Sequence, residues 1–141
     1  MSIFEEYLCS SFNNQWKKYS DPDPVHNFIC IFIKMLEKGK IRRSDTLKSP
    51  TDVCQPNGSS VFMLVPGIIF HRVIEYMKDR RYTNIPSYNK IMGFFRDKAL
   101  AEVYDGGKIE KQKRLCGQRY RVMTIYADKF YKYIRKEIYN V

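Results

Sequence analysis

Two amphipathic segments separated by a short turn constrain the fold of this chain most strongly. The first, PGIIFHRVIEYMKD, places Ile69, Val73 and Met77 on one face of a helix, and the turn RRYTNIP follows it. Ser87 is a suitable N-cap for a second helix, SYNKIMGFFRDKAL. Two helices joined by a turn of a few residues are typical of a helix-turn-helix. The pattern therefore predicts that motif over residues 66–100.

The second of these helices divides into two faces. Its inner face is predicted to contain Tyr88, Ile91, Phe94, Phe95 and Ala99. Its solvent face is predicted to contain Asn89, Lys90, Gly93, Arg96 and Asp97. A glycine in a helix costs about 1 kcal/mol relative to alanine, so Gly93 on the exposed face needs a reason. Close approach of a ligand backbone or of a neighbouring helix would supply one.

A glycine-framed segment, DGGKIEKQKRLCGQRYRV, follows at residues 105–122 and is rich in positive charge. KIEKQK and RYRVMTIY are predicted to pair as strands around a turn that contains Gly117. The basic residues of this segment are Lys108, Lys111, Lys113, Arg114, Arg119 and Arg121. The net charge of the chain is +10, and residues 106–141 contain 10 basic and 3 acidic residues. Such a localised cationic surface attracts polyanions, most often nucleic acid and less often anionic lipid or an acidic protein.

The rest of the chain supplies further predicted helices and one more strand. A capping box at Ser2 and Glu5 predicts an N-terminal helix over residues 3–18. Asp23 caps a second helix, PVHNFICIFIKMLEKG, which is apolar over more than half of its circumference. Residues 40–60 contain proline and glycine without periodicity and are predicted to be a loop. VFMLV is predicted to be a buried strand, and DKFYKYIRKEI a closing helix.

The order of these elements predicts the fold class. After the first helix it is helix, strand, helix, helix, strand, strand, helix, which is the order of an α+β winged helix-turn-helix with extra N-terminal and C-terminal helices. We expect a single domain, with a helical extension over residues 1–20, a winged-helix core over 22–126 and the last helix over 127–141. The basic hairpin is then the wing, which is exposed and positive because it lies against a phosphate backbone.

This fold predicts a surface for duplex or forked DNA. The second helix of the motif enters the major groove, where Asn pairs with adenine and Lys or Arg with guanine, and the hairpin cations contact phosphates. The predicted DNA-binding residues are Ser87, Asn89, Lys90, Arg96, Lys108, Lys111, Lys113, Arg114, Arg119 and Arg121. Tyr104 and Tyr120 flank the hairpin, where they either stack on unpaired bases or pack across the strands.

Motifs for catalysis or metal binding are not recognisable in the sequence. His26 and His71 are the only histidines, and there is no HExxH and no cysteine pair at zinc-binding spacing. A tyrosine nucleophile that cuts DNA would need positioned Arg, His or metal-bound carboxylates, and no recognisable spacing supplies them. We therefore expect no enzymatic activity, no cofactor and no metal.

Cysteine spacing and apolar runs bear on the location of the protein. The four cysteines are far apart, which suits a reducing cytosol better than a disulfide framework. The N-terminal MSIFEEYLCSSF lacks the cationic start of a signal peptide, and the longest apolar run, VFMLVPGIIF, is too short to span a bilayer. The expectation is a soluble cytoplasmic protein with no membrane partner.

Three stretches within residues 22–133 carry a family resemblance. DPDPVHNFICIFIKMLEKGKI, PNGSSVFMLVPGIIFHRVIEYM and GQRYRVMTIYADKFYKYI resemble the winged-helix C-terminal region of replicative or primase-associated helicases carried by bacterial mobile elements and phages. The resemblance implies a role in DNA replication, in which this region touches DNA or positions the helicase motor. Because the chain has no G-x-x-x-x-G-K-[ST], it is not itself the ATPase. It is either a domain excised from such a helicase or a free-standing relative.

A protein-docking module is the alternative function. Winged helices also bind acidic proteins through the same helix and wing, so the chain could instead regulate or position a helicase or another acidic partner. Tight, salt-sensitive binding to DNA would favour the first function, and absence of binding at low salt would favour docking.

Overall fold

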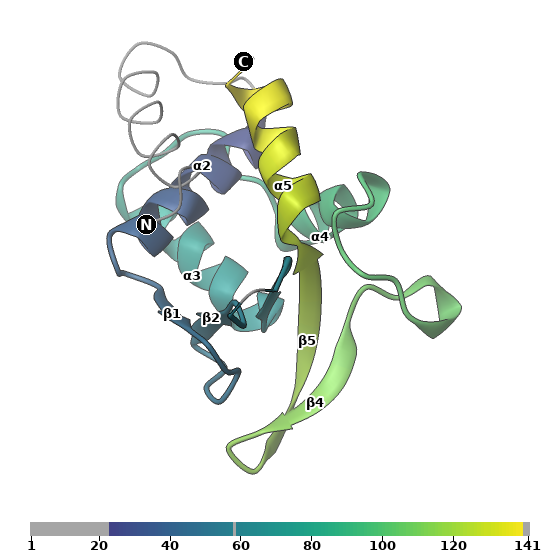
Figure 1. Ribbon diagram of the computed structural model, residues 1–141. Helices are drawn as coiled ribbons and strands as arrows, with labels where there is room; N and C mark the ends of the chain where they lie inside the picture. The colour runs from purple at the N-terminus through teal and green to yellow at the C-terminus, as the bar shows by residue number, and fades with distance from the viewer. Residues whose placement is uncertain (1–22, 58, 140–141) are drawn as a thin grey trace.

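The computed structural model describes residues 23–57 and 59–139 and combines helices with a five-stranded sheet in an α+β arrangement (Figure 1). In chain order the elements are α2 (Pro24–Glu37), β1 (Arg42–Ser44), β2 (Asp52–Cys54), β3 (Val61–Leu64), α3 (Pro66–Asp79), α4 (Tyr88–Asp97), the 3-10 turn η1 (Asp105–Gly107), β4 (Lys111–Leu115), β5 (Gln118–Tyr126), α5 (Ala127–Tyr133) and the π-helical turn η2 (Ile134–Ile138). The strand order in the sheet is β1-β2-β3-β5-β4. The helix predicted over residues 3–18 lies outside the described residues.

Helix α2 forms the centre of the core, as the sequence predicts. The Val25 amide donates a hydrogen bond to Asp23 Oδ1 at 2.9 Å, and Pro24 occupies the first turn, where no amide donor is needed. Gly39 follows the helix with a φ of 74°, a left-handed conformation that favours glycine. Consecutive residues of α2 are buried because α3 and α4 both pack against it.

Helices α3 and α4 occupy the predicted positions, with one correction at the end of α4. The Lys90 amide donates a hydrogen bond to Ser87 Oγ at 3.2 Å, so the predicted N-cap is confirmed. Helix α4 ends at Asp97, and Ala99 is exposed with a φ of 54°. The prediction that Ala99 lies on the inner face was wrong, because the left-handed turn at this residue ends the helix and directs Leu100 into the core.

The segment predicted as a loop over residues 40–60 contains two short strands, which corrects that expectation. β1 pairs in parallel with β2. β2 pairs antiparallel with β3, where Cys54 lies opposite Met63. Three-residue strands are too short to show an alternating pattern, and Pro50 and Pro56 beside β2 favour turns. The extended conformation here depends on pairing with the edge of β3, which is a tertiary contact.

Strand β5 connects the core to the hairpin. Its C-terminal half pairs with β3, where Phe62 lies opposite Ile125 and Leu64 opposite Met123, and these residues belong to the main core. Its N-terminal half pairs with β4. Because the β4–β5 hairpin continues past the end of β3, it projects away from the helices (Figure 1).

Aromatic rings from the helices build the centre of the main core. Phe70 of α3 makes T-shaped contacts with Phe28 and Phe32 of α2 at centroid distances of 5.3 and 5.8 Å. The Phe70 ring also stacks on Phe95 of α4 at 5.5 Å, and Phe95 contacts Phe130 of α5 at 5.8 Å. All of these rings are buried. They fix the position of α4 relative to the other helices, and aromatic pairs contribute about 0.5–1.5 kcal/mol each beyond their burial.

Helix α5 follows β5 directly and packs against β3 and β5. Phe130 and Ile134 are buried as predicted, and Ile138 is half-buried. The predicted closing helix is present, with its last turns in the wider π-helical form. None of the described helices, α5 included, is long and apolar enough to cross a bilayer.

Candidate nucleic-acid interface

The basic hairpin is closed by a tight turn at Cys116 and Gly117, in agreement with the predicted turn. Their φ angles are 52° and 80°, and positive φ at both central residues is what a type I′ turn requires. Leu115 pairs with Gln118 on either side of the turn, so the strands stay in register up to it. The Cys116 thiol donates a hydrogen bond to the carbonyl oxygen of Lys48 at 2.9 Å. This contact ties the tip of the hairpin to the loop before β2.

The two faces of the hairpin carry different residues, because paired residues share a face and successive residues alternate between faces. One face, called the arginine face below, consists of Gln112, Arg114, Arg119 and Arg121. The other face consists of Lys111, Lys113, Leu115, Gln118, Tyr120 and Val122. On this second face Leu115 and Val122 are buried in a small second core. The predicted DNA-binding cations of the strands are therefore divided, with the arginines on one side of the hairpin and Lys111 and Lys113 on the other.

The arginine face concentrates exposed positive charge. Arg114 lies directly opposite Arg119, and Arg121 follows on the same face. Like charges directly opposite each other destabilise a strand pair. None of the ion pairs found among the described residues involves these three arginines. A bound anion such as phosphate would remove the repulsion through charge-assisted hydrogen bonds.

A hollow of about 430 Å³ lies between α4 and the base of the hairpin. It is lined by Met92, Arg96, Lys108, Ile109, Glu110, Gln112 and Arg121. Since Gln112 and Arg121 belong to the arginine face, this face is directed toward the same side of the molecule as α4. The strand predicted to start at Lys108 starts instead at Lys111, because Lys108 forms a bridge with Tyr104 that closes the η1 turn. Helix α4 and the hairpin thus contribute to one surface.

Tyr88, in the first turn of α4, shows how closely the helix approaches the hairpin. Burial, together with the nearby Glu110 carboxylate, raises the pKa of Tyr88 to about 12, and Arg121 acts in the opposite direction. The Tyr88 ring also stacks on His71 of α3, with a centroid distance of 4.8 Å and an interplanar angle of 13°. The start of α4 is therefore held between α3 and the base of the hairpin.

The other predicted residues of α4 are exposed and lie on two sides of the helix. Arg96 lines the hollow, and its Nε lies 3.9 Å from Asp97 Oδ1. Asn89 precedes Arg96 by nearly two full turns, so the two share a side. Lys90 lies about 120° around the helix from Arg96. Ser87 serves as the N-cap.

The two tyrosines that flank the hairpin pack within the protein. The Tyr104 hydroxyl lies 3.2 Å from Thr124 Oγ1 and 3.3 Å from Glu102 Oε2. The Tyr120 hydroxyl donates to Gln118 Oε1 at 2.9 Å, and its ring packs against the second core. Of the two roles considered for these residues, packing across the strands is the one these contacts support.

Gly93 lies on an open part of α4. A Cβ atom at this position would meet only Arg96 Nη2, at 3.8 Å, which is an ordinary van der Waals contact. No neighbouring helix among residues 23–57 and 59–139 approaches this point. Gly93 is half-buried, and no described neighbouring helix accounts for it, so the approach of a ligand stays a prediction.

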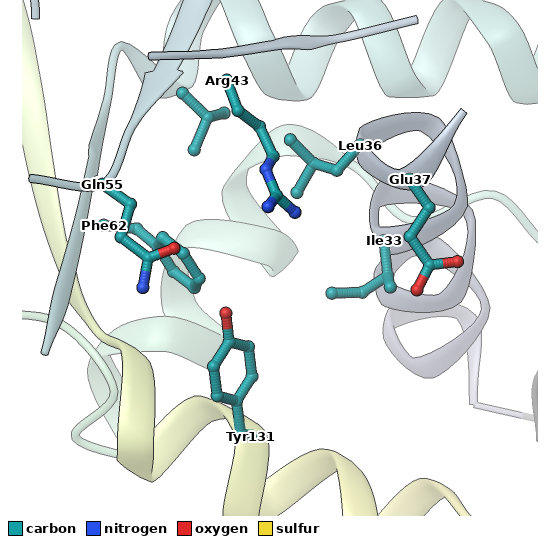
Figure 2. Close-up of a pocket in the computed structure, with 8 residues that line it drawn as sticks. Ile33, Leu36, Glu37, Arg43, Gln55, Phe62 and Tyr131 are labelled. Carbon is teal, nitrogen blue, oxygen red and sulfur yellow. The ribbon is translucent and has the colours of Figure 1, made fainter. Parts of the chain in front are cut away.

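A second hollow lies near the C-terminal end of α2 (Figure 2). It is lined by Ile33, Leu36, Glu37, Arg43, Val53, Gln55, Phe62 and Tyr131. Figure 2 shows the side chains of Arg43, Gln55 and Tyr131 pointing toward it. It encloses about 30 Å³, which is about the volume of one water molecule. This space is too small for an organic ligand, so the hollow beside the hairpin is the stronger candidate site.

Sequence reasoning missed four residues that line the hollow beside the hairpin, namely Met92, Ile109, Glu110 and Gln112. Gln112 could have been found, because it alternates with Arg114 along β4 and therefore shares its face. Met92 and Glu110 had no such signal, since they come together only where α4 meets the hairpin.

Within the described part of the chain, no group of three or more His, Cys, Asp or Glu residues could hold a metal ion. Comparison with protein-family models, with curated proteins and with solved structures finds no match for this chain. The geometry and charge of the surface formed by α4 and the hairpin are therefore the basis for assigning a function.

Proposed function

We propose that this chain is a non-catalytic winged-helix module that binds DNA, with α4 as the recognition helix and the β4–β5 hairpin as the wing. Apart from the short strands β1 and β2 and the η1 turn, the elements follow the order α2, β3, α3, α4, β4, β5, which supports this fold assignment. A role in replication or maintenance of a mobile genetic element, beside a helicase motor or another replication protein, is part of the proposal and derives from the family resemblance of residues 22–133.

The observation that carries the proposal is the direction of the arginine face. Three arginines project from a hairpin that extends past the core, and two of them repel each other across the strands. Their face is continuous with the hollow beside α4, where Arg96 and Lys108 add two more cations. Exposed cations held together on one side of a protein fit the regularly spaced phosphates of a nucleic acid.

The two parts of the surface have different roles in this proposal. The cations contact phosphates, which gives affinity and orientation without reading the sequence. Asn89, in the first turn of α4, has an amide that can bond to adenine in the major groove. Replacing Asn89 with Ala should therefore change the preference among DNA sequences more than the overall affinity.

The salt dependence of binding tests the proposal. We expect labelled duplex DNA to bind with a slope of about −4.5 in log affinity against log salt, because five phosphates are neutralised by the basic surface. The basic surface consists of Arg96, Lys108, Arg114, Arg119 and Arg121. Fluorescence anisotropy between 50 and 300 mM KCl, roughly the range in which such binding is salt-sensitive, measures this slope. Absence of DNA binding at the lowest salt would overturn the proposal and favour an acidic protein as the partner.

Substitution of Gly93 by Ala should have opposite effects on stability and on binding. The free energy of unfolding should rise by about 0.5–1 kcal/mol, because alanine is the better helix former and its methyl group meets no obstacle. DNA binding should weaken, because the methyl group occupies the space through which the DNA backbone approaches. Urea denaturation and anisotropy measure the two effects.

Gly67→Ala is the matched control for this substitution. Gly67 is a helical glycine of α3, exposed and without a neighbour within 4 Å of an added Cβ, so an alanine there also meets no obstacle. Its replacement should leave DNA affinity unchanged. Wild-type DNA affinity in Gly93→Ala would show that DNA does not approach α4 at this point.

A further inference from the structure

The hollow between α4 and the hairpin has a mixed chemical character that a phosphate site does not explain. Arg96, Lys108 and Arg121 give it positive charge, but Glu110 contributes a carboxylate and Met92 an apolar side chain. A carboxylate disfavours a phosphate nearby, because like charges repel strongly where water is partly excluded. A phosphate placed directly beside Glu110 would meet that repulsion, whereas the arginine face farther along the hairpin presents no carboxylate.

The same residues suit a nucleobase. The half-buried Met92, beside the buried Ile109, provides an apolar surface for the face of a base, and methionine sulfur contacts aromatic rings favourably. Glu110 can accept a hydrogen bond from an exocyclic amino group, such as N4 of cytosine, and the amide of Gln112 can both donate and accept. Enzymes that extract a base from a duplex bind it by this combination of apolar contacts and hydrogen bonds to its edge.

Size and surroundings agree with one nucleotide. The volume of about 430 Å³ lies within the range of about 300–1,000 Å³ that is usual for small-molecule pockets. Cations at the hollow would hold the phosphates on either side of an inserted base. A base that is stacked and paired in a duplex cannot enter, so the nucleotide must be unpaired.

We propose that this hollow binds an unpaired nucleobase, so that the preferred DNA is a junction between duplex and single strand. The proposal rests on the proposed DNA-binding function. The arginine face then holds the duplex backbone, and the hollow receives a base of the adjoining single strand, because the hollow lies at the base of the hairpin and the arginine face extends from it toward the tip.

Anisotropy titrations at one salt concentration test this specificity. The probes are a blunt duplex, the same duplex with a single-stranded fork, and forks in which one of the first unpaired nucleotides on either strand is abasic. The fork should bind at least about fivefold more tightly than the blunt duplex, as expected for one additional stacked base. An abasic nucleotide keeps the phosphate but lacks the base. When it replaces the nucleotide whose base enters the hollow, the preference for the fork over the blunt duplex should disappear.

Glu110→Ala provides the protein side of the test, and the measured quantity is the ratio of fork affinity to blunt-duplex affinity. The ratio should fall toward one in Glu110→Ala, although total affinity rises because a negative charge is removed. Glu75→Ala removes an exposed carboxylate on α3 and should leave the ratio unchanged.

The outcomes separate the two proposals. Equal binding of fork and blunt duplex, or a fork preference that no abasic substitution reduces, would overturn the base-binding role and leave the DNA-binding function standing. A fork preference that Glu110→Ala leaves intact would also overturn it. Failure to bind any of these DNAs would overturn both.

Discussion

The double substitution Arg114→Gln/Arg119→Gln should weaken DNA binding about 60-fold at 0.1 M salt and make the slope of log affinity against log salt less steep by about 2. The two arginines are exposed, lie opposite each other and share the arginine face with Arg121. Each phosphate contact contributes about 0.9 to the slope. The loss of one contact at 0.1 M salt therefore weakens binding about eightfold. Anisotropy with duplex DNA over a salt series measures both quantities.

Lys111→Gln/Lys113→Gln is the matched control. It removes the same charge from the same hairpin, but from the opposite face. Since charges more than about 10 Å from the DNA are largely screened at 0.1 M salt, it should weaken binding less than about fivefold. Equal losses in the two double variants would show that total charge, and not the arginine face, determines affinity.

Folding of the arginine variant can be checked independently. Removal of the repulsion between Arg114 and Arg119 should leave the thermal midpoint unchanged or slightly raised, because like charges across a strand pair are destabilising by about 0.2–1 kcal/mol. A lowered midpoint would mean that these arginines stabilise the hairpin, and the loss of binding would then need another explanation.

Phe70→Ala should lower the free energy of unfolding by about 3–5 kcal/mol. The Phe70 ring is fully buried and contacts Phe28, Phe32 and Phe95, so its removal leaves a cavity lined by the other rings. Domains of this size are stable by only about 5–15 kcal/mol, so the variant should be close to unfolding at 37 °C. Urea denaturation followed by circular dichroism measures the change.

Two further variants keep this prediction testable if Phe70→Ala does not fold. Phe70→Leu retains most of the buried volume and should lose less stability than the alanine variant. Val103→Ala truncates a side chain that is 57% exposed and should change stability by no more than about 0.5 kcal/mol. A loss in Phe70→Leu as small as that in Val103→Ala would contradict the central position of Phe70 in the core.

Local sequence signals predicted the helices and the hairpin well. Asp23 and Ser87 mark the starts of α2 and α4 because their side chains accept hydrogen bonds from amides of the first turn. Cys116 and Gly117 mark the hairpin turn, where glycine in particular adopts a positive φ. Each of these signals depends on residues only a few positions apart, so no knowledge of the tertiary structure is needed to read it.

The strands β1 and β2 and the division of the basic hairpin were not predicted. β1 and β2 are extended because of their partners in the sheet, and their own residues carry no alternating pattern. In the hairpin, charge alone grouped Lys111 and Lys113 with the arginines. Leu115 and Val122 are buried in the second core. The opposite face of the hairpin, which is the arginine face, is therefore the one that remains open on the side of α4.

The linear chain thus determined the positions of α2, α3, α4 and the hairpin, and it located the excess positive charge near the C-terminus. Only the tertiary structure decided which cations lie on the same face and what lies beside them. Met92 and Glu110 are far apart in sequence and line one hollow because the aromatic core holds α4 against the base of the hairpin. Helix caps and turns are set by interactions within a few residues, whereas a binding surface is set by long-range packing that brings distant segments together.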